Sequence, residues 1–287
     1  MVPTKGRRVA SRFALRGCRA IVTGASSGLG AEFARQLAPV ADALLLTARR
    51  ADRLEVLRSE LLNVRPDLVV ECCPGDVATS EGRGLVVERI ATNRFAPNLL
   101  INNAGLGDYG TFASADSERL AAQIDVNVSG LVMLTHALLP HLVRTAGRPA
   151  GVLNVSSLAG TLPLPDAAVY AATKAFVTSF SEAIRIELAP ENIIVSAVCP
   201  GPTPTGFRHV ARREGGHDTD RSKDGLLTVP PGEVVRHALA ALEANRALVF
   251  PGWGPTGAGW LFRVVSRPLL RWLLRRRFAR SQLSAEG

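Results

Sequence analysis

Residues 20–30 read Ala-Ile-Val-Thr-Gly-Ala-Ser-Ser-Gly-Leu-Gly, a short apolar run followed by a glycine-rich turn. The glycines at 24, 28 and 30 are spaced G-x-x-x-G-x-G, a variant of the commoner G-x-G-x-x-G. Gly24 allows a tight turn, Gly28 lets the backbone approach a phosphate, and Gly30 lets the next helix pack closely. The stretch predicts a strand, a turn and a helix whose first N–H groups face a dinucleotide pyrophosphate. A strand–helix turn without a ligand is the alternative.

Apolar runs of strand length alternate with helical patterns along the rest of the chain. The expected strands cover residues 20–22, 43–47, 68–72, 99–101, 152–155, 193–198 and 247–250. The expected helices cover residues 29–38, 51–62, about 79–91, 117–144, 167–188 and 231–244. This alternation predicts an α/β fold, a doubly wound Rossmann-type domain of about seven parallel strands with helices on both faces. In such a fold, ligands bind beyond the carboxyl ends of the strands.

The net charge of +9 is concentrated at the two ends of the 287-residue chain. Residues 1–20 and 255–287 each carry +6, so residues 21–254 carry −3. We expect a flexible basic arm over 1–16, a catalytic domain over 17–254 and a basic amphipathic segment over 255–287. A slightly acidic central body argues against nucleic-acid binding, which needs a basic stripe of its own.

The cysteines and histidines form no pattern typical of a metal site or a disulfide framework. Cys18, Cys72, Cys73 and Cys199 lie in or beside expected strands, and the five histidines are scattered. We therefore expect reduced thiols, no metal and a cytoplasmic location. Apolar runs are too short to cross a bilayer, and no secretory signal is visible. The ratio of 31 arginines to 3 lysines is typical of a GC-rich bacterial source.

The end of the second expected strand indicates which nicotinamide cofactor would bind. It reads Thr47-Ala48-Arg49-Arg50 and has no acidic residue to hold a ribose 2′-hydroxyl. Arg49 is placed to meet a 2′-phosphate, which a planar guanidinium suits well. This favours NADP(H) over NAD(H), unless both arginines are solvated charges at the start of the next helix.

A second motif, Tyr170-x-x-x-Lys174, lies in a chain that has only two tyrosines and three lysines. A helix would place both side chains on one face. A free phenol has a pKa of about 10, and a nearby cation favours its deprotonated form. The pair can therefore move a proton onto or off a carbinol oxygen. A lone pair of this kind is more often a surface contact.

The full set of motifs resembles the short-chain dehydrogenases/reductases, in their compact single-domain form, over residues 17–251. The resemblance is carried, in family order and spacing, by Thr23-Gly-x-x-x-Gly-x-Gly30, Asp76, Asn102-Asn103-Ala104-Gly105, Asn127, Ser157, Tyr170-x-x-x-Lys174 and Pro200-Gly201. Each motif is weak alone, whereas the ordered set is highly specific.

The resemblance implies a catalytic role for four residues. Tyr170 would be the general acid in carbonyl reduction and the general base in alcohol oxidation, and Lys174 would also reach the nicotinamide ribose. Ser157, thirteen residues before Tyr170 as in the family, would bind the substrate oxygen in preference to Ser156. Asn127 would kink a helix and hold a water that relays protons to the lysine.

The cofactor contacts that the motifs and the resemblance imply extend over most of the carboxyl edge of the sheet. Asp76 would contact the adenine, with a purely turn-forming role as the alternative. The expected set is Gly24, Ser26, Ser27, Gly28, Leu29, Gly30, Arg49, Asp76, Val77, Asn103, Ala104, Gly105, Tyr170, Lys174, Pro200, Gly201, Thr203 and Thr205.

The expected function is NADP(H)-dependent hydride transfer between nicotinamide and the carbonyl or secondary alcohol of a small molecule. Leu158, Leu162, Pro163, Leu164 and Phe207 predict an apolar substrate, and the loop 206–227 is expected to close over it. A non-catalytic nucleotide-binding or scaffolding protein is the main alternative. A dehydratase or epimerase, which usually needs a further substrate domain, is the other. Relatives are commonly dimers or tetramers, so a homodimer or homotetramer is expected.

Residues 260–280 depart from the minimal family pattern. Arg263, Arg267, Arg271 and Arg275 recur every four residues among large apolar side chains, with Pro268 expected to break or kink the helix. An arginine-rich, tryptophan-bearing helix can lie on an anionic membrane surface. It can also pack across a subunit interface or over the active site, and both readings remain open.

Overall fold

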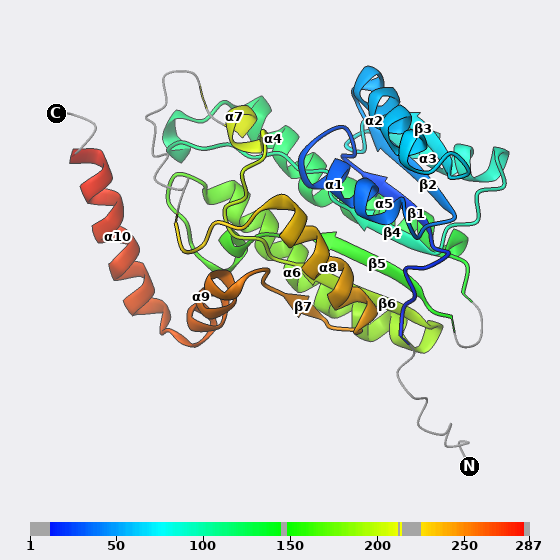
Figure 1. The fold of residues 1–287 in the computed structure, drawn as a ribbon. Coiled ribbons are helices and arrows are strands. Elements are labelled where there is room, and N and C mark those ends of the chain that lie inside the picture. Colours follow the sequence, from blue (N-terminus) through cyan, green and yellow to red (C-terminus); the bar gives the residue numbers. More distant parts are fainter. Residues whose placement is uncertain (1–11, 145–147, 212, 214–224, 284–287) are drawn as a thin grey trace, which may run out of the picture.

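The computed structural model describes residues 12–144, 148–211, 213 and 225–283, and in this part of the chain the strands form one seven-stranded parallel sheet (Figure 1). The strands are β1 (Arg19–Thr23), β2 (Ala43–Ala48), β3 (Val69–Pro74), β4 (Leu99–Asn102), β5 (Ala150–Val155), β6 (Ile193–Val198) and β7 (Leu248–Val249). Their order in the sheet is β3-β2-β1-β4-β5-β6-β7. The predicted doubly wound α/β fold is confirmed.

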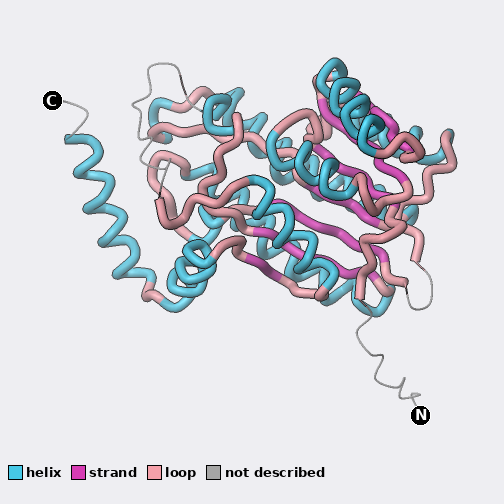
Figure 2. The backbone as a smooth tube through the Cα atoms, viewed as in Figure 1, coloured by secondary structure: helices cyan, strands magenta, loops and turns pink. Residues whose placement is uncertain are grey.

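The helices cover both faces of the sheet (Figure 2). They are α1 (Gly28–Leu37), α2 (Ala51–Val64), α3 (Ser80–Thr92), α4 (Ser117–Ile124), α5 (Leu131–Leu138), α6 (Ala168–Leu188), α7 (Phe207–Ala211), α8 (Pro231–Glu243), α9 (Trp253–Val264) and α10 (Arg267–Leu283). Most begin where the sequence indicates a start. Thr79, for example, accepts a hydrogen bond from Gly82 N and so caps α3.

Successive strand residues point into two different hydrophobic cores, because side chains alternate across a sheet. Val22 of β1 packs with α1, α2 and α8, whereas its neighbour Ile21 packs with α3, α5 and α6. β2 repeats the pattern, with Leu44 on the first face and Leu45 on the second. Burial on both faces explains why the central positions of these strands, Ala20–Val22 and Ala43–Leu46, are all apolar.

The order of the sheet reverses between β1 and β4, which pair directly although they are first and fourth along the chain. At such a switch point the loops after neighbouring strands diverge and leave a crevice. The glycine turn follows β1, and Asn103 follows β4. These two expected site segments therefore meet at the crevice.

The long helix expected over 117–144 is interrupted by one wide turn. A π-helical turn, η2 (Asp125–Gly130), separates α4 from α5, and a short 3₁₀ turn follows α5. Gly130 is crowded there, because a Cβ would lie 2.7 Å from the Val77 carbonyl oxygen. π-turns of this kind occur often at functional sites, and this one contains Asn127.

The same stretch, Ser117–His141, is long and apolar enough by composition to span a membrane, with a mean hydropathy of 1.2. Polar residues such as Asp125 and Asn127 interrupt this stretch, so it is not a continuous apolar run. The indication is weak, because core helices of globular proteins also meet this criterion.

The C-terminal segment forms two helices rather than one. α9 ends at Val264, and Val265 is extended before α10 begins at Arg267. Pro268 lies in the first turn of α10, where a missing N–H costs no hydrogen bond. The break therefore precedes the proline.

At the other end, Phe13 is buried in the core and Leu15 N donates a hydrogen bond to Glu243 Oε1. Residues 1–11 lie outside the described residues, so the mobile arm stays a prediction.

Candidate active site

The glycine turn after β1 has the shape of a phosphate cradle. Gly24 and Gly28 have φ angles of +66° and +56°, in the left-handed region that favours glycine. At Gly30 a Cβ would lie 2.3 Å from the Gly24 carbonyl oxygen, so no side chain fits. Ser27 precedes α1 without a capping side-chain hydrogen bond, and the first turn holds no acid. The N–H groups at the start of α1 are therefore suited to an anion.

Asn103 fixes the turn to the neighbouring strand β4. Its Nδ2 donates to the carbonyl oxygens of Thr23 (2.9 Å) and Gly24 (3.3 Å). The Thr23 hydroxyl in turn accepts from the N–H groups of Asn103 and Ala104, both at 3.0 Å. The Asn103 side chain thus holds the cradle in shape, and its expected contact with the cofactor stays a prediction.

Two arginines follow β2, and the structure places them differently. Arg50 Nη2 donates to the hydroxyls of Ser26 (3.1 Å) and Ser27 (2.9 Å), so it extends over the glycine turn. Arg49 lies 3.8 Å from Asp76, and its side chain is 63% exposed. Only Arg49 was expected at the site. Arg50 was missed because the sequence does not indicate which of two adjacent arginines turns towards the serines.

Asp76 forms the turn after β3. Its Oδ1 accepts a hydrogen bond from Ala78 N at 3.0 Å, and its carbonyl oxygen accepts from Thr79 N. Val77 beside it is buried in the core. The turn-forming role therefore holds for Asp76, and its carboxylate still lies on the same edge of the sheet as Arg49.

Tyr170 and Lys174 lie one turn apart on α6 and are both buried, with exposures of 8% and 4%. Lys174 Nζ donates to the Val155 carbonyl oxygen at the end of β5 (2.9 Å) and lies 5.9 Å from the centre of the Tyr170 ring. Burial lowers the pKa of Lys174 to about 8, because desolvation penalises the ammonium. The pair is therefore buried against the carboxyl end of β5 and is not a contact on the protein surface.

Asn127 and Gly105 lie beside that lysine. Asn127 Nδ2 donates to Leu106 O (2.8 Å) and Thr173 Oγ1 (3.0 Å), and its Oδ1 accepts from Leu106 N (2.8 Å). A Cβ added at Gly105 would lie 3.3 Å from Asn127 Oδ1 and 3.4 Å from Lys174 Nζ. The absence of a side chain at Gly105 thus leaves space between the amide and the ammonium.

The two serines after β5 have different surroundings. Ser156 is buried, and its hydroxyl bonds to Lys174 O and Thr178 Oγ1, both at 2.7 Å. Ser157 is partly exposed, and its Oγ accepts from Ala159 N at 3.1 Å. Since Ser157 is an acceptor in that bond, its own hydroxyl proton can still be donated. The geometry favours Ser157 over Ser156, as expected from the spacing.

The segment after β6 borders both the serine and the glycine turn. The Pro200 carbonyl oxygen accepts from Leu158 N, next to Ser157. A Cβ at Gly28 would lie 3.4 Å from Thr205 Cβ, so Thr205 faces the cradle. Thr203 Oγ1 donates to Gly201 O. Thr205 therefore borders the glycine turn, whereas the Thr203 hydroxyl bonds within its own turn, and the cofactor contacts of both threonines stay predictions.

Aromatic side chains cover Tyr170. The rings of Tyr109 and Phe207 lie 6.1 and 5.8 Å from it, centre to centre, in tilted orientations. Phe207 begins α7, and a Cβ at Gly107 would lie 2.9 Å from both Phe207 and Ala211. α7 therefore packs directly on the loop after β4. Of the loop 206–227, residues 212 and 214–224 lie outside the described residues.

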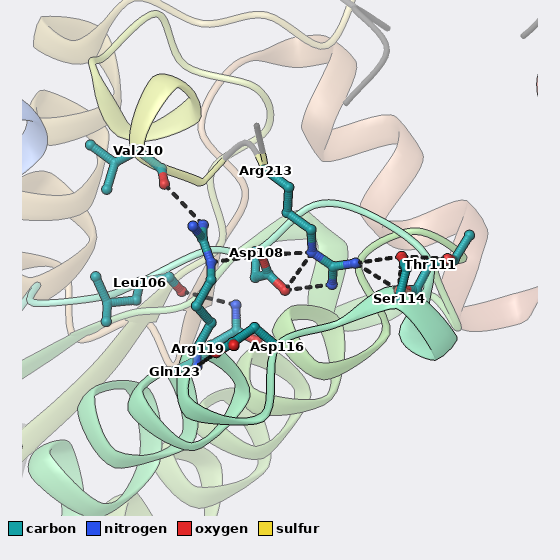
Figure 3. Close-up of polar contacts among 9 residues, drawn as sticks. All are labelled: Leu106, Asp108, Thr111, Ser114, Asp116, Arg119, Gln123, Val210 and Arg213. Atoms are coloured by element: carbon teal, nitrogen blue, oxygen red, sulfur yellow. Dashed lines mark hydrogen bonds and ion pairs between the residues drawn. The ribbon is translucent and has the colours of Figure 1, made fainter. Parts of the chain in front are cut away.

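A buried carboxylate holds α7 in this position (Figure 3). The Asp108 side chain, 3% exposed, accepts hydrogen bonds from Nε and Nη2 of Arg213 and pairs with Arg119 Nε at 3.2 Å. Arg213 also donates to Thr111 O, and Arg119 donates to Val210 O in α7. Asp108 thus connects three segments distant in the sequence and keeps the cover in place over Tyr170.

Sequence reasoning missed this cluster, and no motif could have shown it. Asp108, Arg119 and Arg213 are single charged residues in three separate segments, each of which reads as an ordinary surface residue. Only the folded chain shows that Asp108 is buried.

Of the four cysteines, Cys199 lies beside the site, with its Sγ 3.7 Å from Thr178 Oγ1, the hydroxyl that bonds to Ser156. In the described part of the chain the four thiols are free, and burial raises the pKa values of Cys18 and Cys72 to about 12. Among the described residues no three His, Cys, Asp or Glu side chains gather at one point.

Comparison with known proteins identifies the family. The family model described as short chain dehydrogenase matches residues 19–215. The sulfoacetaldehyde reductase of Chromohalobacter salexigens is 38% identical over 196 residues, which are 68% of this chain and 75% of that protein. The short-chain dehydrogenase from Sphingobium yanoikuyae in complex with NADPH is 28% identical with a TM-score of 0.72, covering 93% and 95% of the two chains.

A further solved structure contains NADH, which lacks the 2′-phosphate of NADPH. The 3-ketoacyl-(acyl-carrier-protein) reductase from Brucella melitensis complexed with NADH is 26% identical with a TM-score of 0.72, covering 84% of this chain and all of that one. The family model extends over the glycine turn, the Tyr170–Lys174 pair and strands β1 to β6. The chain belongs to the short-chain dehydrogenase family and is an oxidoreductase of the nicotinamide-dependent kind.

Proposed function

We propose that this protein transfers hydride between NADP(H) and the carbonyl or secondary alcohol of an apolar small molecule, with Tyr170 as the general acid and base. The observation that carries the proposal is the buried Tyr170–Lys174 pair, which lies at the carboxyl edge of the sheet together with the glycine cradle. The nicotinamide would supply or accept the hydride.

Each of the four polar residues has a separate role in this reaction. In the reducing direction Tyr170 donates a proton to the substrate oxygen, and in the oxidising direction it accepts one. Lys174, when protonated, favours the phenolate that remains. Ser157 donates a hydrogen bond to the substrate oxygen and stabilises charge that develops there. Asn127 maintains the π-turn, with the open space at Gly105 between its amide and Lys174.

The surroundings of Tyr170 support an apolar substrate. Phe207 and Tyr109 pack on its ring, and Leu158 follows Ser157. Three charged side chains beside this cover are paired, because Asp108 binds both Arg119 and Arg213. They therefore offer no obvious partner for a charged substrate. The relatives act on chemically different carbonyl compounds, so their names do not narrow the substrate further.

Replacing Tyr170 with phenylalanine removes only the proposed acid. We expect kcat to fall roughly 10²–10⁴-fold toward any ketone that the parent reduces, the range typical of general acid catalysis. NADPH affinity, measured by fluorescence titration, stays within about twofold because the ring remains in place. Tyr109→Phe, the only other tyrosine change available, retains most of the activity. A Tyr170→Phe protein as active as its parent would refute the assignment of Tyr170 as the general acid and base.

The preference for NADP(H) is proposed to rest on Arg50 together with Arg49. Arg50 already bonds to Ser26 and Ser27, where a ribose 2′-phosphate would lie if the pyrophosphate occupies the glycine turn. We expect Arg50→Ala to weaken NADPH binding roughly 10- to 100-fold and NADH binding little, since a charge-assisted hydrogen bond contributes about 1.5–3 kcal/mol. Arg49→Asp should act in the same direction.

Arg53→Ala, an exposed arginine on α2, serves as the matched control and should leave both affinities unchanged. Equal losses of NADPH and NADH affinity in the Arg50 and Arg49 variants would rule out the 2′-phosphate assignment.

The oligomeric state is proposed to be a homodimer or homotetramer that uses the outer faces of α4 and α6. Phe112, Ile124 and Phe176 are exposed large apolar residues that line a hollow of about 460 Å³ on this face. A second copy would remove this surface from water. We expect sedimentation equilibrium to give at least twice the chain mass of 30.5 kDa, and Phe176→Glu to lower it. A monomer at all concentrations would contradict the proposal.

A further inference from the structure

All three tryptophans of the chain lie in α9 and α10 and are exposed to solvent. Trp253, Trp260 and Trp272 have exposures of 76%, 59% and 47%. Four further large apolar residues in the same two helices, Leu261, Val264, Leu269 and Leu273, are between 48% and 79% exposed. We call these seven residues the C-terminal apolar surface. So many exposed apolar side chains in one segment mark an interaction site.

The packing of α9 fixes which of its faces is exposed. Pro255 and Gly259 are buried, and a Cβ at Gly259 would lie 2.6 Å from the Phe250 ring. Trp253, Trp260 and Val264 are seven and four residues apart, a spacing that places them on the opposite face of the helix. Their exposure therefore follows from how α9 is anchored and is not a fraying of the chain end.

α10 continues the surface away from the body of the protein. Figure 1 shows it leaving α9 and running apart from the sheet and its covering helices. Leu270, near its start, is 3% exposed and anchors the helix. In the first two turns Leu269, Trp272 and Leu273 lie on a different side from Arg267 and Arg271. The alternation of apolar and basic residues in the sequence is lost beyond Arg275, which is followed by two further arginines.

The charge of this segment is entirely positive. Residues 244–285 contain no Asp or Glu and eight arginines, at 246, 263, 267, 271, 275, 276, 277 and 280. Two of these lie over tryptophan rings, with the Arg276 guanidinium 3.9 Å from the centre of Trp272 and that of Arg263 5.7 Å from Trp260. Arginine stems of this kind can lie along apolar surface while their charge reaches a polar layer.

We propose that the C-terminal apolar surface docks on the surface of a lipid bilayer that contains anionic lipids. Tryptophan is enriched where a bilayer meets water, and clustered arginines attract anionic headgroups. A second copy of the chain fits less well, because a two-fold contact through these helices would bring arginines against arginines. The proposal goes beyond hydride transfer and does not depend on it.

Docking here would place the bilayer beside the proposed active site. Ala258 and Phe262 of α9 pack with Leu158, which follows Ser157, and Pro255 lies 3.0 Å from a Cβ built at Gly201. Helix α9 thus exposes Trp253 and Trp260 on one face, and its opposite face packs beside the residues of the proposed active site.

The chain provides its own probe for this proposal, because tryptophan occurs only in the segment in question. We expect the full-length protein to float with vesicles of phosphatidylcholine mixed with phosphatidylserine, and its tryptophan emission to shift to shorter wavelength. Vesicles of phosphatidylcholine alone should give weak binding, and added salt should release the protein from the anionic vesicles.

Matched variants separate the charge from the apolar contacts. The Arg271→Ala, Arg275→Ala protein should bind anionic vesicles about 30-fold more weakly, from the contribution expected per arginine near such a surface. Removing the exposed arginines Arg53 and Arg89, in α2 and α3, makes the same change in net charge and should leave binding nearly unchanged. Trp260→Ala with Trp253→Ala should weaken binding while Trp272 still reports it.

Three results would overturn the proposal. The first is no flotation and no emission shift with either vesicle. The second is a lack of dependence on charge, which would appear as equal binding to neutral and anionic vesicles or as equal losses in the α10 and control arginine variants. The third is an emission shift that depends on protein concentration without lipid, which would make a second copy of the chain the occupant.

Discussion

The proposed chemistry depends on one energetically unfavourable feature, which is the burial of the Lys174 ammonium beside the end of β5. The lysine is 4% exposed and donates to a single carbonyl oxygen, that of Val155, among the protein contacts described. Lowering its pKa from 10.5 to about 8 corresponds to a cost of about 3 kcal/mol for keeping it charged. Because the unfolded chain binds this proton more tightly, the cost is present below pH 8 and declines as the pH rises toward 10.5. Buried groups with strongly shifted pKa values are found most often at functional sites.

Several other features of the fold serve to hold that lysine and its tyrosine in place. The π-turn brings Asn127 to Leu106 and Thr173, one residue before Lys174. Ser156 bonds to the Lys174 carbonyl oxygen from the other side. Asp108, through Arg213 and Arg119, keeps α7 and Phe207 over Tyr170. The active site is thus held from beneath by hydrogen bonds. It is covered by a short helix that packs on the loop after β4 and is also attached through ion pairs.

The parts that sequence could predict are those that depend on local chemistry. The strands show as continuous apolar runs because both faces are buried, and the glycine turn shows because only glycine fits at 24, 28 and 30. The choice of Ser157 over Ser156 from spacing agrees with their burial. Arg50 and the Asp108 cluster could not be predicted, since each depends on which distant segments meet. A kink at Asn127 was implied by the family resemblance, whereas its form as a π-turn was not. For Asp76 and Asn103 the sequence predicted the position at the carboxyl edge of the sheet. The contacts in the structure give both side chains a structural role, in a turn and in the glycine cradle.

The most direct measurement is the titration of Lys174 itself, which is practical because the chain has only three lysines. In NMR spectra of protein with isotope-labelled lysine, we predict one side-chain resonance with a pKa near 8, well below the ordinary value of about 10.4. That resonance should be missing from the Lys174→Met protein, which assigns it. If every lysine resonance titrates at the ordinary value, Lys174 is solvated, and the buried pair on which the proposed mechanism relies does not exist.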